Sequence, residues 1–144
     1  MAVKPVPDGF HTVTPYLLVK GASGLMEFLK RAFDAQETER MTTPDGTVAH
    51  GEMRIGDSMV MLAEASGSNK PVPAMLFLYV PDVDGSYRRA LQAGATPARE
   101  VRDEFYGDRV GAVDDGFGNQ WWLASHIEDV SPEEMARRRA ARGG

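Results

Sequence analysis

The chain has 144 residues, of which 42% are hydrophobic and 26% charged, which is ordinary for one soluble globular domain. Its formal net charge of -5 gives no global support for binding nucleic acid or an anionic membrane, and no apolar run approaches the ~18 residues of a membrane span. Cysteine is absent, which excludes disulfides, thiolate nucleophiles and cysteine-based metal sites, and we expect a cytoplasmic protein.

The first half of the chain predicts a strand, a helix and three further strands. The assignments rest on β-branched and aromatic runs for strands, on apolar residues at helical spacing for the helix, and on turn residues between them. An extended arm comes first, and the five elements follow at residues 11–19, 22–33, 36–42, 47–55 and 58–63. Pro15 inside the first strand indicates an edge position or a bulge, because proline cannot donate to a ladder.

The second half repeats this order after a polar linker over residues 64–73. The strand, helix and three strands of the repeat are predicted at residues 75–80, 82–93, 96–101, 106–113 and 120–125. Gly94 is placed to end the helix. We therefore divide a single domain into module one (residues 11–63) and module two (residues 74–126). Each module alone is too small to bury a good core, so we expect the two to pair.

A C-terminal helix is predicted over residues 131–142. Ser131 is suited to the N-cap, Pro132 to the first helical position, and Glu134 to a capping box. The end of this helix is strongly basic. Its arginines fit either a surface for nucleic acid or an acidic partner, or favourable cations at a helix C-terminus that point into solvent. The acidic chain as a whole favours the second interpretation.

Residues 106–123 predict a hairpin in which two tryptophans follow a turn. Trp121 and Trp122 must point to opposite faces of their strand, so we assign Trp121 to the core and Trp122 to a cavity. The turn contains Asp114 and Asp115. Their position favours hydrogen bonds to the backbone of the turn over a catalytic pair of acids.

Several motifs resemble the vicinal oxygen chelate superfamily, which includes glyoxalase I, bleomycin-resistance proteins and extradiol dioxygenases, and within it the PhnB-like branch. These motifs are HTVTPYL, RIGDS, YGDR, FGN and HIEDVS, at residues 11–17, 54–58, 106–109, 117–119 and 126–131. The resemblance implies an α+β fold of two β-α-β-β-β modules. Their sheets curl as half-barrels around a cavity, with the helices outside. Exposed sheet edges and the extra C-terminal helix favour a homodimer.

Members of this superfamily that use a metal take its ligands from the first and last strands of each module. Counting from the shared landmarks places those four positions on Thr14, Met61, Met75 and Trp122. Divalent ions of the usual kinds are bound by carboxylate oxygen, imidazole nitrogen or thiolate, which these residues lack. The resemblance therefore implies the fold without its metal, and we expect no cofactor.

Two other groups of residues could carry chemistry. Alternation along residues 48–55 predicts that Ala49, Gly51, Met53 and Ile55 face the helix, and it leaves three ionisable side chains, His50, Glu52 and Arg54, on the concave face. There His50 could carry a proton, or the three could simply form a solvated sheet face. Tyr106 could stack on a ligand and Arg109 could bind an anion, or Asp108 and Arg109 could tie their strand to a neighbouring loop. His11 and His126 are expected to be structural or exposed.

We expect metal-independent binding of a small aromatic or amphipathic organic molecule, in a sequestration or resistance role. The residues expected to line its pocket are Thr14, Tyr16, His50, Glu52, Met61, Met75, Tyr106, Arg109 and Trp122. One alternative is an enzyme of the superfamily, a lyase, isomerase or dioxygenase with an atypical site, for which His50 and Glu52 are the catalytic candidates. A second alternative is an interaction module that uses the basic C-terminal helix.

Overall fold

The computed structural model describes residues 2–143 and confirms the predicted α+β fold with two modules of the same element order. Module 1 consists of β1 (Tyr16–Val19), α1 (Ala22–Phe33), β2 (Gln36–Thr42), β3 (Val48–Ile55) and β4 (Ser58–Glu64). Module 2 consists of β5 (Ala74–Tyr79), α2 (Val83–Gln92), β6 (Thr96–Asp103), β7 (Asp108–Asp114) and β8 (Asn119–His126). A third helix, α3 (Pro132–Ala141), follows.

Each module forms its own four-stranded sheet, and the two sheets have equivalent strand orders. The order is β1-β4-β3-β2 in module 1 and β5-β8-β7-β6 in module 2. In both, the first strand pairs in parallel with the last strand of the module, while the remaining pairs are antiparallel. The helix that follows the first strand is the crossover that such a parallel pair requires.

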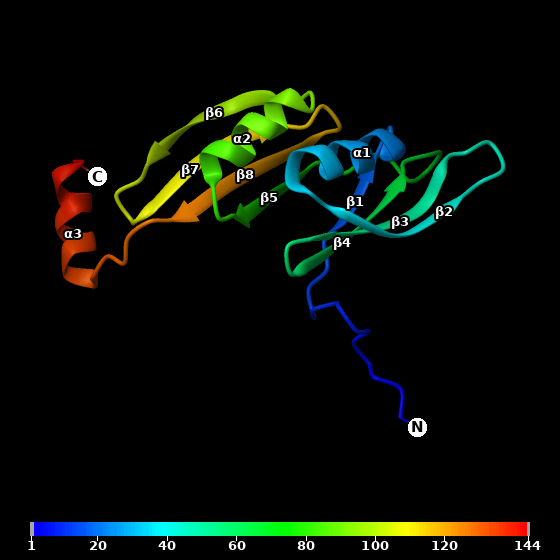
Figure 1. The fold of residues 1–144 in the computed structure, drawn as a ribbon, viewed down its shortest axis with the longest axis horizontal. Coiled ribbons are helices and arrows are strands. Elements are labelled where there is room, and N and C mark those ends of the chain that lie inside the picture. Colours follow the sequence, from blue (N-terminus) through cyan, green and yellow to red (C-terminus); the bar gives the residue numbers. More distant parts are fainter. Residues whose placement is uncertain (1, 144) are drawn as a thin grey trace.

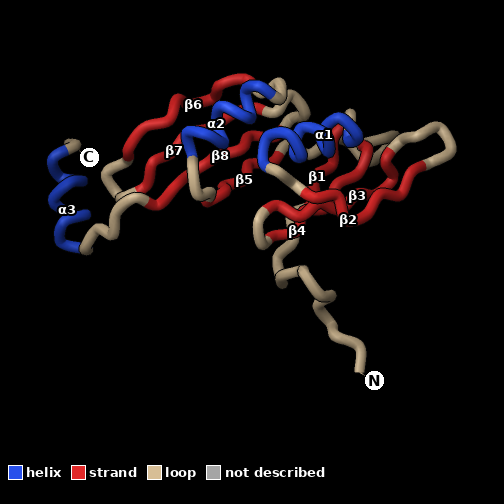
Figure 2. Tube along the Cα trace, in the orientation of Figure 1, coloured by secondary structure: helices blue, strands red, loops and turns tan. Residues whose placement is uncertain are grey.

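The two sheets lie side by side, and α1 and α2 cover the same side of both (Figure 1). Figure 2 shows that the opposite side of the sheets carries no helix and that α3 stands at the far end of module 2. The buried apolar side chains form one continuous core between the helices and the sheets. The sheet side without helices, here called the concave face, is therefore where side chains remain available.

Aromatic residues join the cores of the two modules. The rings of Phe33, at the end of α1, and Trp121, in β8, lie 5.3 Å apart between centroids. Phe117, in the turn before β8, packs on Gly21 and Gly24 at the start of α1, where an added Cβ would meet its ring at 3.1 and 3.0 Å. The helix of module 1 is thus fixed against the last hairpin of module 2.

Helix α1 begins without a capping side chain of its own. Its N-cap is Gly21, in the left-handed region at φ 87°, and the amides of Gly21 and Ala22 donate to the carboxylate of Glu64 at 2.9 Å each. Glu64 lies at the end of β4, one residue beyond the predicted strand. A carboxylate at a helix N-terminus is favourable because it binds the free amides and complements the helix dipole.

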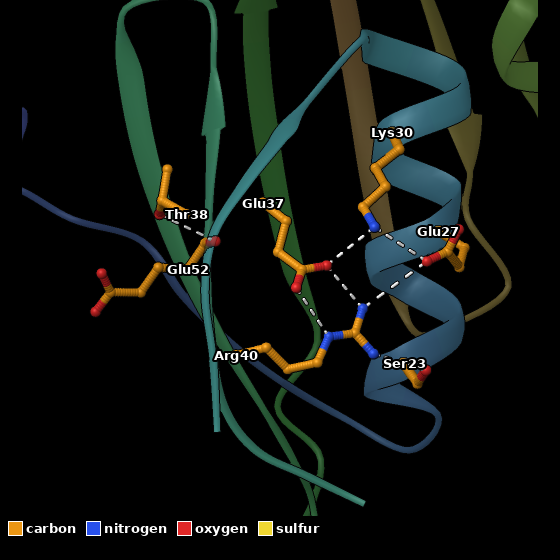
Figure 3. Close-up of polar contacts among 7 residues, drawn as sticks. All are labelled: Ser23, Glu27, Lys30, Glu37, Thr38, Arg40 and Glu52. Carbon is orange, nitrogen blue, oxygen red and sulfur yellow. Dashed lines mark hydrogen bonds and ion pairs between the residues drawn. The ribbon is translucent and has the colours of Figure 1, made fainter. Parts of the chain in front are cut away.

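An ion-pair cluster fastens the outer side of α1 to β2 (Figure 3). The Glu37 carboxylate contacts Lys30 Nζ and Arg40 Nη2, each at 2.9 Å. Glu37, with a smaller contribution from Glu27, raises the pKa of Lys30, and Arg40 is the main cause of the lowered pKa of Glu37. Because the cluster lies at the surface and is partly exposed, it contributes modest stability and serves to orient the edge strand.

The hairpin of β7 and β8 is built around the buried carboxylate of Asp115. Its Oδ1 accepts from the amides of Phe117 and Asn119, and its Oδ2 accepts from Asn119 Nδ2 and from Trp121 Nε1 at 2.9 Å. The expectation of backbone hydrogen bonding in this turn is therefore confirmed for Asp115. Asp114 is exposed and accepts only a 3.3 Å bond from the Gln120 side chain.

A few polar contacts hold the C-terminal segment to module 2. His126 Nδ1 lies 2.8 Å from the buried Asp108 carboxylate and its Nε2 lies 2.7 Å from Asp129, so both carboxylates raise the pKa of His126, with Asp108 the larger cause. Farther along, Arg138 of α3 binds the Glu128 carboxylate through two nitrogens at 2.8 Å each and donates to the Phe105 carbonyl.

Several arginines at the end of the chain contact the protein itself and do not point freely into solvent as the second interpretation had expected. Arg139 and Arg142 lie over the Phe105 ring at 5.9 and 4.5 Å. Ser131 caps α3 as predicted, by accepting from the Glu134 amide at 3.1 Å. The Glu134 carboxylate, which we expected to complete a capping box, instead contacts Arg138 at 2.8 Å.

Two expectations about strands are wrong in detail. Residues 11–15 are irregular, and Pro15 contributes only its carbonyl, which accepts from the Met61 amide at 2.9 Å. In β3 the pairing with β2 shifts at its start, so Val48 is fully buried while Ala49 is exposed and does not face the helix.

Among residues 2–143, no helix is long and apolar enough to cross a membrane.

Replacing Asp115 by alanine is expected to lower the free energy of unfolding by about 3 kcal/mol, because it leaves buried donors of Asn119 and Trp121 unpaired. The matched control Asp114→Ala removes an exposed carboxylate from the preceding position and should change stability by less than about 0.5 kcal/mol. Urea unfolding of both variants measures the difference. Equal midpoints would contradict the role given to Asp115.

The contacts of His126 predict a pH dependence of stability. Because folding raises the pKa of His126, its contribution is fully present below the unfolded value of about 6.5 and is lost as the pH rises through the folded value. Asp108 and Asp129 face the ring. Tyr79, bound to Asp108, also has a raised pKa but keeps its proton below pH 9. Urea unfolding between pH 6 and 9 should show falling stability in the wild type and a flatter profile in His126→Gln. Parallel profiles would refute the assignment.

Candidate functional site

A large cavity lies between the two modules and has a volume of about 840 Å³. This size is within the range of pockets that take small organic ligands. One wall comes from module 1, namely the segment that enters β1 and the turn between β3 and β4. The other wall is β5, together with Phe33, Trp121 and two residues of α2.

The wall formed by β5 is largely apolar and partly open to solvent. On its concave face Met75, Phe77 and Tyr79 are 63%, 45% and 65% exposed, while the intervening residues turn toward the helices and pack on the core. Such a surface of thioether and aromatic groups is adaptable and suits a flat organic molecule. Ser86 and Arg89, from α2, add polar groups to the lining.

Three predicted site residues form a chain of hydrogen bonds on the concave face of module 1. The Tyr16 hydroxyl lies 3.1 Å from His50 Nδ1, and His50 Nε2 lies 2.9 Å from the Glu52 carboxylate. Figure 3 shows Glu52 pointing away from α1, as predicted from strand alternation. Tyr16 is half-exposed and lines the cavity, whereas His50 and Glu52 lie behind it and are largely covered.

The concave face of module 2 carries a similar set of residues in a different order. Tyr79 donates to Asp108 at 2.8 Å, and the same carboxylate binds His126. Here a carboxylate, not an imidazole, accepts the hydrogen bond of the phenol, and it raises the pKa of Tyr79. The Tyr79 proton is therefore held more firmly than in free tyrosine, which makes this set a structural anchor.

Trp122 lies on the concave face in the middle of module 2, but it does not line the large cavity, where we expected it. Its Nε1 donates to the Gln120 side chain at 2.7 Å, and the guanidinium of Arg99 lies 5.4 Å from its ring centroid. Arg99 in turn contacts the Glu104 carboxylate. Trp121 is fully buried, as expected, and its ring also forms part of the cavity wall.

The residues at the four inherited metal positions do not fit a metal ion. Thr14, Met61, Met75 and Trp122 offer a hydroxyl, two thioethers and an indole, and the Thr14 hydroxyl points to the His11 carbonyl at 3.4 Å. No group of three or more His, Cys, Asp or Glu side chains in residues 2–143 is arranged to hold a metal. Of the four, only Met75 lines the large cavity as described here.

The other predicted binding residues lie away from this cavity. Arg109 binds both oxygens of Asp84, in α2, at 2.9 Å and also contacts Asp103, and it lowers the pKa of Asp84. It therefore joins β7 to α2 and β6. Tyr106 packs edge-on against Phe105, with ring centroids 5.3 Å apart, and burial raises its pKa.

Sequence reasoning missed Phe77, Tyr79 and Arg89 among the lining residues. The alternation of large side chains at 75, 77 and 79 was a sufficient signal for the first two, since these positions share one face of a strand. Nothing in the sequence marked Arg89. Its place in the cavity depends on how α2 packs against the other module.

Comparison with known proteins agrees with this fold. The family described as the glyoxalase/bleomycin resistance protein/dioxygenase superfamily matches residues 9–123. An uncharacterized protein of Mycobacterium bovis is 34% identical over 142 residues, which cover 91% of this chain and 93% of that protein.

Solved structures of other proteins share the architecture. TioX from Micromonospora sp. ML1 superposes with a TM-score of 0.70 at 23% identity, covering 81% of this chain and 99% of TioX. A PhnB protein from Bacillus cereus superposes with a TM-score of 0.63 at 16% identity, covering 80% of this chain and 99% of that one. The paired modules and the family match lead to one conclusion: the chain belongs to the glyoxalase/bleomycin resistance protein/dioxygenase superfamily.

Proposed function

We propose that the protein binds a small aromatic or amphipathic organic molecule without a metal, in the cavity between its modules. The observation that carries this proposal is the cavity of about 840 Å³, with Met75, Phe77 and Tyr79 exposed along one wall. Apolar side chains left in solvent in a concave site gain free energy when a ligand covers them, at about 25 cal/mol per Å² buried. A role in sequestration or resistance suits such binding.

The polar residues of the cavity suggest how a ligand is oriented. Arg89 lies in the last turn of α2 and lines the cavity together with Ser86. Of the charged residues that line the cavity, Asp34, Asp57 and Arg89, the arginine is the one that can bind a carboxylate or a similar anionic group of a ligand. We therefore expect an aromatic acid to bind better than the corresponding neutral compound.

We also propose that the protein belongs to the PhnB-like branch of the superfamily, on the motifs at residues 11–17, 54–58, 106–109, 117–119 and 126–131. Two of these motifs have a structural place in the cavity. The first leads into β1 and contains Tyr16, and the second forms the turn at Gly56 and Asp57, which lines the opposite part of the same wall. Membership of this branch does not indicate which reaction the protein catalyses, because one scaffold supports many chemistries.

Replacing Met75 by lysine should weaken binding of aromatic acids at least about tenfold, because it puts a charge on the apolar wall. The matched control is Met41→Lys, which changes a methionine that is 55% exposed on β2, away from the cavity. A library of aromatic acids titrated against tryptophan fluorescence provides the measurement, since Trp121 forms part of the wall.

Three outcomes of this titration would contradict the proposal: no compound perturbs the fluorescence, both variants bind alike, or binding requires an added metal. Calorimetry with Zn²⁺, Ni²⁺, Mn²⁺ and Fe²⁺ covers the last of these. A stoichiometric site in the absence of ligand would restore the metal-dependent alternative.

We further propose that a second copy of the chain partly covers the concave face of β5. This strand is the outer one of its sheet, and outer strands with exposed apolar side chains are usually covered. Phe77→Lys should therefore shift the protein toward monomer in sedimentation velocity runs. The control Ile127→Lys, at a residue that is 52% exposed beyond β8, should not. A monomeric wild type would disprove the dimer.

A further inference from the structure

The hydrogen bonds of Tyr16, His50 and Glu52 define the direction in which a proton can move. An ionised carboxylate only accepts, so His50 Nε2 must carry the hydrogen that bonds Glu52 at 2.9 Å. In neutral His50 the other nitrogen, Nδ1, then has no hydrogen and accepts from the Tyr16 hydroxyl at 3.1 Å. The imidazole is thus held in one tautomer, with its free lone pair directed at the phenol.

Tyr16 is the member of this chain that a ligand can touch. Its side chain is half-exposed and lines the cavity, while the side chains of His50 and Glu52 are 25% and 16% exposed and stand behind it. The phenol oxygen keeps a lone pair for a ligand proton while it donates its own hydrogen to His50. The arrangement resembles a nucleophile or base that is activated by a second base, which a third group orients.

We propose that Tyr16 is a catalytic acid and base, with His50 and Glu52 as positioning residues, and that the protein catalyses keto–enol proton shifts of small aryl carbonyl compounds. This proposal rests on the ligand binding proposed above. A carbonyl is required because only a C–H bond next to one is acidic enough for a phenol and an imidazole to accept its proton. The apolar wall of the cavity takes the aryl ring.

The step balances without a co-reactant. The C–H bond next to the carbonyl breaks, its electron pair forms the new C=C bond, and the π pair of the carbonyl moves onto the carbonyl oxygen, which gives the enolate. The proton passes to Tyr16 Oη. The original Tyr16 hydrogen moves to His50 Nδ1, and the imidazolium is held by Glu52. In the reverse direction Tyr16 returns a proton to the carbon. No electron is gained or lost by the protein.

Tyr79, the second tyrosine of the concave face, differs from Tyr16 in the group that accepts its hydrogen bond. Tyr79 donates to Asp108, a carboxylate that raises its pKa, and His126 lies on the far side of that carboxylate. Such a phenol keeps its proton, because a carboxylate is a weaker base than an imidazole. Only the set in module 1 has an imidazole nitrogen free to take the phenol hydrogen.

Phenylpyruvate is the probe that tests the proposal. Its ring matches the apolar wall, its carboxylate matches Arg89, and its benzylic hydrogens exchange with D₂O through the enol. Binding is measured by calorimetry, and exchange is measured by proton NMR at neutral pH. The wild type should exceed the buffer rate, Tyr16→Phe should lower the enzymatic rate about 100-fold or more, and His50→Gln should lower it at least about tenfold, all without a matching loss of affinity.

The proton transfer through Tyr16 and His50 is here called the relay. Two control variants and one spectroscopic measurement distinguish it from a purely structural role of these residues. Tyr87→Phe and His126→Gln change a tyrosine and a histidine outside the cavity and should keep the exchange rate. Nitrogen-15 NMR should show His50 protonated at Nε2 in the wild type, and Glu52→Gln should abolish this preference while the fold is kept.

The outcomes distinguish the two proposals. Phenylpyruvate that binds but exchanges at the buffer rate overturns the relay and leaves ligand binding in place. A Tyr16→Phe variant with wild-type exchange, or a His50 ring protonated at Nδ1, also overturns the relay. If phenylpyruvate and the rest of the aromatic library do not bind at all, the binding proposal fails, and the relay fails with it.

Discussion

The buried carboxylate of Asp115 is the constraint on which the arrangement of module 2 depends. A side chain that is 3% exposed accepts hydrogen bonds from the turn backbone, from Asn119 and from the indole of Trp121. These bonds fix the register of β8, because a slip of one residue would exchange the faces of its side chains. With Trp121 held in the core against Phe33, Trp122 necessarily lies on the concave face. The packing of Phe33 and Phe117 against the same region then sets one module against the other.

Much of the fold could be predicted from the sequence because local patterns and the repeated element order agree. Helix α1 and strand β2 have the predicted bounds, and the other elements differ mainly at their ends. The start of β1 is the largest error. Pro15 forbids a ladder bond there, and the β-branched residues before it had suggested a strand.

The site was only partly predictable, because it depends on contacts between distant segments. Strand alternation placed His50 and Glu52 on the concave face, but their link to Tyr16 requires that β1 pair with β4 next to β3. The partners of Arg109 lie in α2 and β6, and no periodicity in the sequence indicates them. The same limit applies to Arg89, which reaches the cavity only through the packing of the two modules.

The parallel pair that closes each sheet has a consequence for synthesis of the chain. Tyr16 pairs with Met61 and Ala74 pairs with Asn119, so in both modules partners are 45 residues apart in sequence (16 to 61 and 74 to 119). Neither β1 nor β5 can pair with its partner strand until nearly its whole module has left the ribosome. Such non-local pairing is slow. Module 1 can complete its own sheet while module 2 is still being translated. The part of α1 that packs on Phe117 and Trp121 stays uncovered until the last hairpin of module 2 has been translated.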